Sequence, residues 1–274
     1  MRATCCRHRW GTISSDRRAA RGVARRRAVR FSILTPSFNQ GQFLDRHIRS
    51  VTAQATPGVE IEHIVIDGGS TDGSVEVLRR RDADLAYWQS APDEGQSDAL
   101  GQALNRATGD VVGWLNSDEF YLPGAIASVA EAFDRKPAAV LVYADYDRVT
   151  ETGRLIRHTK SWRFDYDVCR VQTPIIMNCA AFLDRRRVVE CGGFSRDYHY
   201  IMDWDLYTRF MTRTSQYVRL RRPLAQFTVH PESKTVVDPA AFADEISRMR
   251  AAMFPGWTEQ AIASEQRRQY RRMQ

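Results

Sequence analysis

Short apolar runs of strand length alternate with amphipathic segments of helical period from Val29 to Asp145. Each run, such as residues 30–34 and 61–66, ends in a polar loop, after which apolar residues recur at helical spacing. The starts of these runs recur about every 25–30 residues, which is close to the length of a β-α-β unit. The alternation predicts an α/β fold with a Rossmann-like, mostly parallel sheet and helices on both faces.

The pattern is less regular after Asp145, where aromatic and charged residues are more frequent. Because no low-complexity linker separates the two parts, we expect one continuous domain over residues 29–240. Its first half, residues 29–145, is expected to bind a nucleotide-like ligand, and its second half, residues 146–240, to shape a substrate site. Further helices are predicted within residues 241–274.

Basic residues are concentrated at the start of the chain. Residues 1–30 hold ten arginines and one acid, Asp16, a formal charge of +9, whereas the whole chain carries +7, so the remainder carries −2. Three interpretations of residues 1–28 are open: a disordered leader, a basic arm for an anionic membrane or nucleic acid, and a transit-like peptide. We favour the disordered leader, because the segment has no sustained apolar face.

The cysteines and the hydropathy limit where such a chain can work. Five cysteines without C-x-x-C spacing argue against a disulfide framework and against a zinc site, so we expect a reducing compartment, the cytoplasm. The composition, 43% hydrophobic and 27% charged, is that of an ordinary globular protein. No apolar run approaches the roughly 18 residues that span a bilayer, so any membrane contact is expected to be peripheral, at the inner face.

Acids and small polar residues follow four of the predicted strands. The carboxyl ends of parallel strands meet at one edge of a sheet, where ligands bind, so these loops are expected to lie close together. A single acid after a strand is more often a turn former or a helix cap than a catalytic group. The placement of all four loops at one edge favours a binding site. The loops are Thr35-Pro36-Ser37-Phe38-Asn39, residues 67–73, residues 92–95 and Asn116-Ser117-Asp118-Glu119.

Six motifs occur in order along about residues 30–237. They are Thr35-Pro36-Ser37-Phe38-Asn39, Val65-Ile66-Asp67-Gly68-Gly69-Ser70-Thr71-Asp72-Gly73-Ser74, Gly113-Trp114-Leu115-Asn116-Ser117-Asp118-Glu119, Gly192-Gly193-Phe194, Met202-Asp203-Trp204-Asp205-Leu206 and Val229-His230-Pro231-Glu232-Ser233-Lys234. Each alone is a weak signal, but the ordered set resembles that of family-2 glycosyltransferases. The resemblance implies a GT-A fold and an inverting, metal-dependent transfer of sugar from a UDP- or GDP-linked donor. It also implies a carbohydrate or lipid-linked acceptor, in polysaccharide, O-antigen or glycolipid synthesis.

A nucleoside diphosphate leaving group carries concentrated negative charge, and a cation held by hard oxygen ligands helps to expel it. By resemblance, Asp118 is expected to hold Mn²⁺ or Mg²⁺, and His230 to close on the same metal through a neutral imidazole. Asn116 stands where the family commonly has Asp, so this chain has an amide in place of one carboxylate. The role of Glu119 stays open, and a capped turn before Pro123 is the alternative interpretation of the motif.

Asp203 matches the catalytic base of the family, at the start of a predicted helix whose apolar face includes Leu206 and Phe210. An inverting displacement needs a base that takes the proton of the acceptor hydroxyl. We expect the helix N-terminus to hold the Asp203 carboxyl in its ionised form, and an N-cap is the alternative interpretation. Met202 stands where the family often has Glu.

The resemblance also implies which residues meet the two substrates. Asp67 is expected to contact the nucleobase, Asp93 the nucleoside or sugar, and Lys234 the phosphates. The expected donor-side residues are Thr35, Pro36, Ser37, Asp67, Asp93, Asn116 and Lys234, and the expected acceptor-side residues are Asn178 and Trp204. From the sequence alone, a turn role for Asp67 and a core position for Trp204 are equally compatible with the pattern.

Two other functions remain open from the residues themselves. A sugar nucleotidyltransferase of related fold typically grips a triphosphate with a glycine- and lysine-rich loop, but residues 35–41 hold no Lys or Arg. A non-enzymatic module would use the arginine-rich leader to bind an anionic surface. The −2 charge of the remaining chain disfavours a nucleic-acid partner.

Overall fold

The computed structural model describes residues 29–164, 176–211, 216–231, 238–253 and 255–273. The predicted leader and Lys234 lie outside these residues. The strands are β1 (Val29–Ser37), β2 (Val59–Asp67), β3 (Tyr87–Ser90), β4 (Val111–Trp114), β5 (Glu119–Tyr121), β6 (Leu141–Thr150), β7 (Leu155–Thr159), β8 (Ala181–Asp184) and β9 (Tyr217–Val229). The α-helices are α1 (Gly41–Thr52), α2 (Ser74–Arg80), α3 (Gln96–Arg106), α4 (Ala125–Arg135), α6 (Arg185–Glu190), α7 (Met202–Met211), α9 (Pro239–Met253) and α10 (Glu259–Met273).

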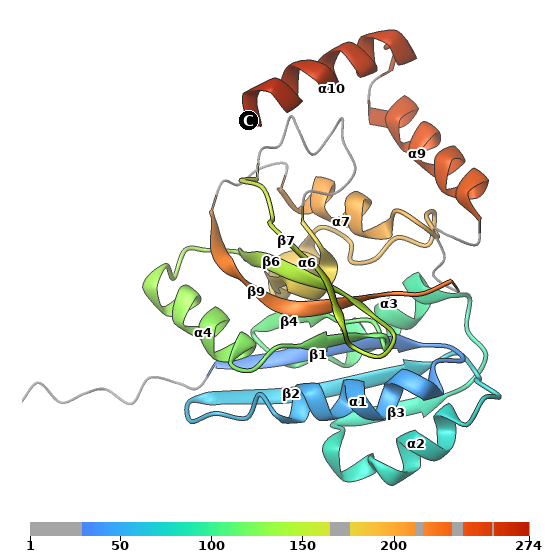
Figure 1. Cartoon of the computed structure of the whole chain (residues 1–274), viewed down its shortest axis with the longest axis vertical. Coiled ribbons are helices and arrows are strands. Elements are labelled where there is room, and N and C mark those ends of the chain that lie inside the picture. The colour runs from blue at the N-terminus through green and yellow to red at the C-terminus, as the bar shows by residue number, and fades with distance from the viewer. Residues whose placement is uncertain (1–28, 165–175, 212–215, 232–237, 254, 274) are drawn as a thin grey trace, which may run out of the picture.

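The strands of the described residues form one sheet in the order β3-β2-β1-β4-β8-β6-β9-β5, with β7 paired to β6 (Figure 1). The first four, β3, β2, β1 and β4, are mutually parallel. Ser37 is the register partner of Asp67, so the loops after β1 and β2 begin at the same edge of the sheet. The α/β fold expected from the alternating pattern is therefore confirmed, and the parallel part carries the predicted polar loops.

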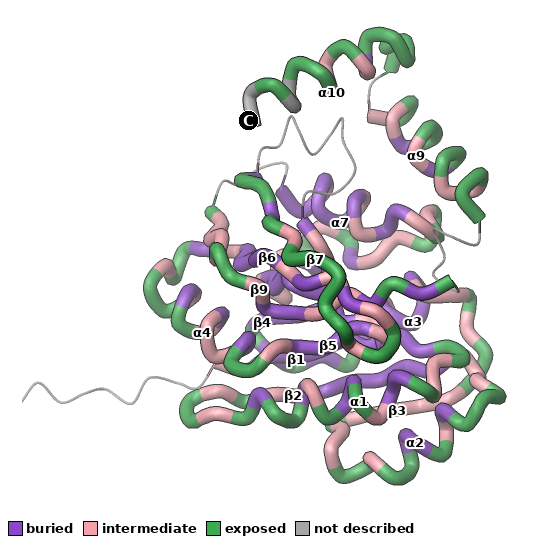
Figure 2. Tube along the Cα trace, viewed as in Figure 1, coloured by how far each residue is buried: buried purple, intermediate pink, exposed green. Residues whose placement is uncertain are grey.

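Alternate residues of the parallel strands face opposite layers of helices, as the period of two requires. On one face Leu34 and Ile64 pack in a core cluster with α3, α7 and α9. On the other face Ile33 packs with α4, and Val65 packs with α1 and α2. Figure 2 shows the resulting pattern, with buried central strands and a largely exposed α10.

In the second half of the sheet the local pattern does not predict β5, β7 and β8, and it predicts only the end of β9. β5 has only three residues, Glu119–Tyr121, and pairs antiparallel with the end of β9. β9 has 13 residues, of which only residues 226–229 look strand-like in sequence, because charged residues and Pro223 interrupt its apolar pattern. Pro223 lies where the β6–β9 register shifts, which is where a residue without an N–H is tolerated.

The predicted C-terminal helices are present as α9 and α10. Met249 of α9 joins the core cluster that α3 and α7 form, whereas most of α10 is exposed. The division into a nucleotide-binding half and an acceptor half stays a prediction. No helix in the described part of the chain is both long and apolar enough to cross a membrane.

Candidate active site

Two loops at the carboxyl edge of the sheet are joined by hydrogen bonds. The backbone N–H of Gly68 donates to the Ser37 carbonyl at 2.9 Å, and that of Asn39 donates to Ser70 Oγ at 2.7 Å. In return Asn39 Oδ1 accepts from the backbone N–H of Thr71 at 3.0 Å. Asn39 has a φ of 51°, in the left-handed region that asparagine tolerates better than most residues. The loops after β1 and β2 therefore form one ordered surface.

Asp67 lies beneath this surface with no exposed area. Its carboxylate accepts from the Ser70 backbone N–H at 2.9 Å, from Ser70 Oγ at 2.5 Å and from Ser90 Oγ at 2.6 Å. An ionised carboxylate offers about four acceptor positions, so three of them order the loops after β2 and β3. The structure thus gives Asp67 a turn-forming position, and its contact with a nucleobase stays a prediction.

Phe38 is the exposed aromatic side chain of the β1 loop, with 60% of its surface accessible. It directly follows Ser37, whose carbonyl is joined to Gly68 in the β2 loop. The Asp93 carboxylate also lies against Gly68, because a Cβ atom added there would lie 3.1 Å from Asp93 Oδ2. The motifs alone indicate no role for Phe38, although an aromatic residue in a polar loop after a strand is a usable signal.

Asp118 and His230 lie side by side although 112 residues separate them. Asp118 Oδ2 and His230 Nε2 are 2.9 Å apart, and Thr228 Oγ1 donates to the Asp118 carbonyl at 2.5 Å. The antiparallel β5–β9 pairing, with Glu119 opposite Phe227, sets this juxtaposition. Packing against Phe43 of α1, at 5.4 Å between ring centroids, also fixes the His230 ring. The two predicted metal ligands are thus brought together.

The chemistry of this pair fits a divalent cation. A carboxylate and a neutral imidazole are both ligands of metals such as Mn²⁺, and here the two groups are hydrogen-bonded to each other at 2.9 Å. Within the described residues no group of three or more His, Cys, Asp or Glu side chains could hold a metal ion. A two-ligand protein site suits Mg²⁺ or Mn²⁺ held jointly with substrate phosphates.

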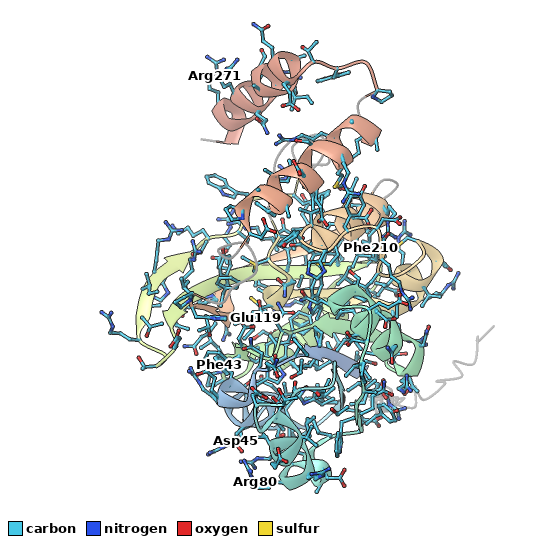
Figure 3. The ribbon with its side chains drawn as sticks, turned by 90° about the vertical axis from the view of Figure 1, so that its right-hand side faces the viewer. Phe43, Asp45, Arg80, Glu119, Phe210 and Arg271 are labelled. Carbon is cyan, nitrogen blue, oxygen red and sulfur yellow. The ribbon has the colours of Figure 1, made fainter. Side chains whose placement is uncertain are left out.

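Glu119 is fully buried and orders the turn that carries Asp118. Its Oε2 accepts from the Asn116 backbone N–H at 2.8 Å and from Asn178 Nδ2 at 3.0 Å, whereas Oε1 has no hydrogen-bond partner among the described residues. Burial, and then the neighbouring Asp118 carboxylate, raise the pKa of Glu119 well above its usual range. Figure 3 shows Glu119 in the interior, between Phe210 of α7 and Phe43 of α1.

The two side-chain amides that are predicted to contact substrate, those of Asn116 and Asn178, make hydrogen bonds within the protein. Asn116 Oδ1 accepts from Trp114 Nε1 and from Gln96 Nε2, both at 2.7 Å, which links the turn to α3. Asn178 is 6% exposed and uses its Nδ2 on Glu119. Their substrate contacts stay predictions, and the structure adds that both fix the turn around Asp118.

A buried pair of histidines lies between β1, β2 and α1. Thr35 Oγ1 is 2.9 Å from His47 Nε2 and 3.0 Å from His63 Nε2, and His47 Nδ1 is 2.8 Å from the Glu119 carbonyl. Burial lowers the pKa of His47 to about 4 and that of His63 well below its usual value. The Thr35 side chain therefore faces these rings, and any contact of Thr35 with a donor would use its backbone. Neither histidine belongs to a motif that predicts a role for it.

Asp203 lies in the first turn of α7, and its carboxyl is desolvated. Burial raises the pKa of Asp203 to about 6, although the Trp204 backbone N–H donates to its Oδ1 at 2.7 Å and favours the ionised form. The expected ionised form is therefore the main one at neutral pH, although desolvation outweighs the helix N-terminus and raises the pKa. A pKa close to neutral suits a general base better than one of 4.

Two neighbours of Asp203 have structural positions. Trp204 has no exposed surface and belongs to the core cluster of α3 and α7, which corrects its predicted placement on the acceptor side. Its indole faces the core, because the side of α7 that carries Trp204 packs in this cluster. Asp205 pairs with Arg209, whose guanidinium also donates to the carbonyls of Cys191 and Gly193. These contacts bind the glycine loop of residues 192–193 to α7.

This chain is similar in sequence to known glycosyltransferases. The sequence model described as glycosyl transferase family 2 matches residues 32–200. An uncharacterized glycosyltransferase of Mycobacterium tuberculosis is 35% identical over 180 residues, covering 65% of this chain and 67% of that protein. Residues 32–200, which the family model matches, include the loops after β1, β2 and β4.

Solved structures show the same fold. TarS of S. aureus aligns with a TM-score of 0.64 and 17% identity over 86% of this chain, but over only 42% of TarS. Residues 1–349 of TarS in complex with UDP-GlcNAc align with a TM-score of 0.63 and 15% identity, over 87% of this chain and 70% of that one. The mannosyltransferase PcManGT of Pyrobaculum calidifontis, in complex with GDP-Man and Mn²⁺, aligns with a TM-score of 0.64 and 19% identity, over 86% and 68%. These likenesses confirm the expected GT-A fold.

Proposed function

Because this chain belongs to glycosyl transferase family 2, we propose that it transfers a sugar, with inversion, from a UDP- or GDP-linked donor to an acceptor hydroxyl. The observation that carries the proposal is the Asp118–His230 pair at the carboxyl edge of the sheet. It lies on the turn after β4, the strand next to β1, whose own loop is joined to that of β2. The site therefore offers a place for a cation next to a surface for a nucleotide.

In this proposal Asp118 and His230 hold Mn²⁺ or Mg²⁺ together with the donor diphosphate. The cation supplies charge neutralisation for the leaving diphosphate. The protein contributes a fixed ligand pair, because Thr228 and the Glu119 turn hold Asp118, and Phe43 packs on His230. The structure of PcManGT contains Mn²⁺ and a nucleotide-sugar, and this supports the assignment.

The donor nucleoside is proposed to lie on the joined loops after β1 and β2. Phe38 offers an exposed aromatic face for the base, and Asp93 offers a carboxylate beside Gly68. The buried Asp67 carboxylate orders the loop after β2 and joins it to the end of β3. UDP-GlcNAc and GDP-Man in the two similar structures support a nucleotide-sugar donor and leave the choice of base open.

Asp203 is proposed as the base that accepts the proton of the acceptor hydroxyl. The hydroxyl oxygen then forms the new glycosidic bond at the anomeric carbon, and the bond to the diphosphate oxygen breaks. Asp203 is ionised for most molecules at neutral pH, because its pKa is about 6, and its desolvation makes it more basic than an exposed carboxylate. A polysaccharide, O-antigen or glycolipid chain is proposed as the acceptor.

A ligand panel tests this function. UDP, GDP, ADP, TDP and their common sugar conjugates are added with Mn²⁺, with Mg²⁺ or with EDTA, and the melting temperature is measured. Binding to the native state raises the melting temperature, so one base class with a divalent cation is expected to stand out. The anomeric configuration of the product, read by NMR, then reports inversion. The absence of a shift with every nucleotide, or release of pyrophosphate from a nucleoside triphosphate, would contradict the proposal.

A further inference from the structure

Glu245 is a buried carboxylate that the proposed chemistry does not use. It lies on α9, beyond the residues that the family model matches, and is 6% exposed. Its two oxygens accept three consecutive backbone N–H groups: Oε1 accepts from His199 at 2.6 Å, and Oε2 accepts from Tyr200 at 2.7 Å and from Ile201 at 3.2 Å. The charged neighbour on its own helix is Arg248, 3.7 Å from Oε1 and 62% exposed.

These three N–H groups belong to the segment that starts α7. The Ile201 carbonyl accepts the N–H of Asp205 at 2.9 Å, which is the first hydrogen bond of the helix. N–H groups at a helix start have no partner within the helix, and an anion there is stabilised by the aligned peptide dipoles. Of the three donors, Ile201 is the residue at the helix start, and His199 and Tyr200 precede it. Glu245 therefore caps α7 at Ile201 and also holds the two residues before it, with charge-assisted hydrogen bonds that are stronger than neutral ones.

The other side of the same segment is held by α3. Arg196 pairs with the buried Asp98 and, at 2.7 Å, with Glu94, and Ser97 Oγ donates to the Tyr198 carbonyl at 3.1 Å. Residues 196–201 are thus fixed between α3 and α9. The position of α7 relative to the sheet depends on both attachments, and Glu245 provides the one next to the helix start.

We propose that Glu245 is a positioning residue for Asp203. Asp203 is the second residue after Ile201, so this attachment fixes the direction in which its carboxyl points and its partial burial in the first turn of α7. α9 thereby becomes part of the catalytic domain. The inference rests on the proposed role of Asp203 as base, and it acts through the backbone of residues 199–201.

The test compares Glu245→Gln and Glu245→Ala with Asp244→Asn, which removes the same charge from an exposed neighbour on the same helix. In Glu245→Gln one carboxylate oxygen becomes an NH₂ group, which cannot accept, so at least one N–H loses its partner. Hydrogen–deuterium exchange at residues 199–201 is expected to accelerate in both Glu245 variants and to stay unchanged in Asp244→Asn. This readout does not depend on activity.

Kinetics separate positioning from simple loss of fold. For Glu245→Gln we expect kcat to fall about 10- to 100-fold, as for a misplaced catalytic group, with donor KM unchanged within about twofold. The midpoint of the acid limb of kcat is expected to move below its wild-type value near 6, because a hydrated Asp203 has a lower pKa. A loss of folded enzyme alone would lower kcat without moving that midpoint.

Three results would overturn the proposal. They are unchanged exchange at residues 199–201 in both Glu245 variants, a wild-type kcat in Glu245→Gln, and a reduced kcat with an unmoved pH midpoint. If Glu245→Ala fails to fold, Glu245→Gln still decides between these outcomes. A wild-type protein that turns over no nucleotide-sugar overturns the proposed function itself, and the positioning role with it, even where the exchange result confirms the contacts.

Discussion

His230 Nε2 lies 2.9 Å from Asp118 Oδ2, across 112 residues of sequence. The contact exists because β9, the last strand in the chain order, returns to pair with the three-residue strand β5. Asp118 directly precedes β5 and His230 directly follows β9. The pairing of these two strands thus assembles the candidate metal site, while the loops after the parallel strands β1 and β2 form the surface proposed for the nucleotide.

Replacing the proposed base is expected to reduce turnover and to leave nucleotide binding unchanged. For Asp203→Asn we expect kcat to fall about 10²- to 10⁴-fold, the usual contribution of general base catalysis, with nucleotide affinity unchanged. In the wild type kcat is expected to fall as pH drops below about 6, because protonated Asp203 cannot accept the hydroxyl proton. Initial rates between pH 5 and 8 measure this limb. A variant with wild-type kcat would exclude Asp203 as the base.

The exposed ring of Phe38 is expected to contribute to donor affinity. Stacking of a base on an aromatic side chain is worth about 1–3 kcal/mol, so Phe38→Ala should weaken nucleoside diphosphate binding about 5- to 150-fold. Calorimetry with the preferred nucleotide measures the change. Leu155→Ala serves as the control, because Leu155 is an exposed apolar side chain on β7. Equal nucleotide affinity in Phe38→Ala and in the control would show that Phe38 does not belong to the donor site.

The buried histidines predict a specific loss of stability in acid. His47 has a pKa near 4 in the folded protein and about 6.5 when unfolded, so the unfolded state binds more protons below about pH 6.5. The His47 contribution to the free energy of unfolding is therefore present above that pH and falls by about 2 kcal/mol on going to pH 5.

The variant His47→Gln isolates this effect from the carboxyls with raised pKa, Asp203 and Glu119, which act in the opposite direction. Urea unfolding of both proteins at pH 7.5 and pH 5 gives the comparison. The substitution is expected to lower the free energy of unfolding by about 2 kcal/mol less at pH 5 than at pH 7.5. An equal loss of unfolding free energy at the two pH values would show that His47 is not buried in its neutral form.

The local pattern of the sequence predicts the strands and loops of the parallel part, because a strand of a βαβ unit is a short apolar run wherever it pairs. β5 and most of β9 are not predicted in this way, since their pairing joins distant segments, β5 has only three residues, and arginines and Pro223 interrupt the apolar pattern of β9. The histidine pair was detectable in principle. His47 occupies the i+3 position of the apolar template that starts at Leu44, and His63 lies on the inward side of β2 with Val65.

The chemistry of single residues depended on burial that no motif encodes. The motif suggests a donor contact for Asp67, but the carboxylate is enclosed by Ser70 and Ser90. It predicts an ionised Asp203, but it does not predict that desolvation raises the pKa of this carboxyl to about 6. Trp204 follows Asp203 in the motif and yet belongs to the core, because the helix turns its side chain toward the sheet.

The most direct test of the central claim is an electron paramagnetic resonance titration of Mn²⁺ with the nucleoside diphosphate that stabilises the protein best. The spectrum of free Mn²⁺ is expected to decrease to one equivalent bound in the wild type. In Asp118→Ala and His230→Ala, binding is expected to weaken about 10- to 100-fold or more, whereas Glu131→Gln, an exposed change on α4, behaves as the wild type. Equal Mn²⁺ binding in all four proteins, or nucleotide binding that is unaffected by EDTA, would contradict the account.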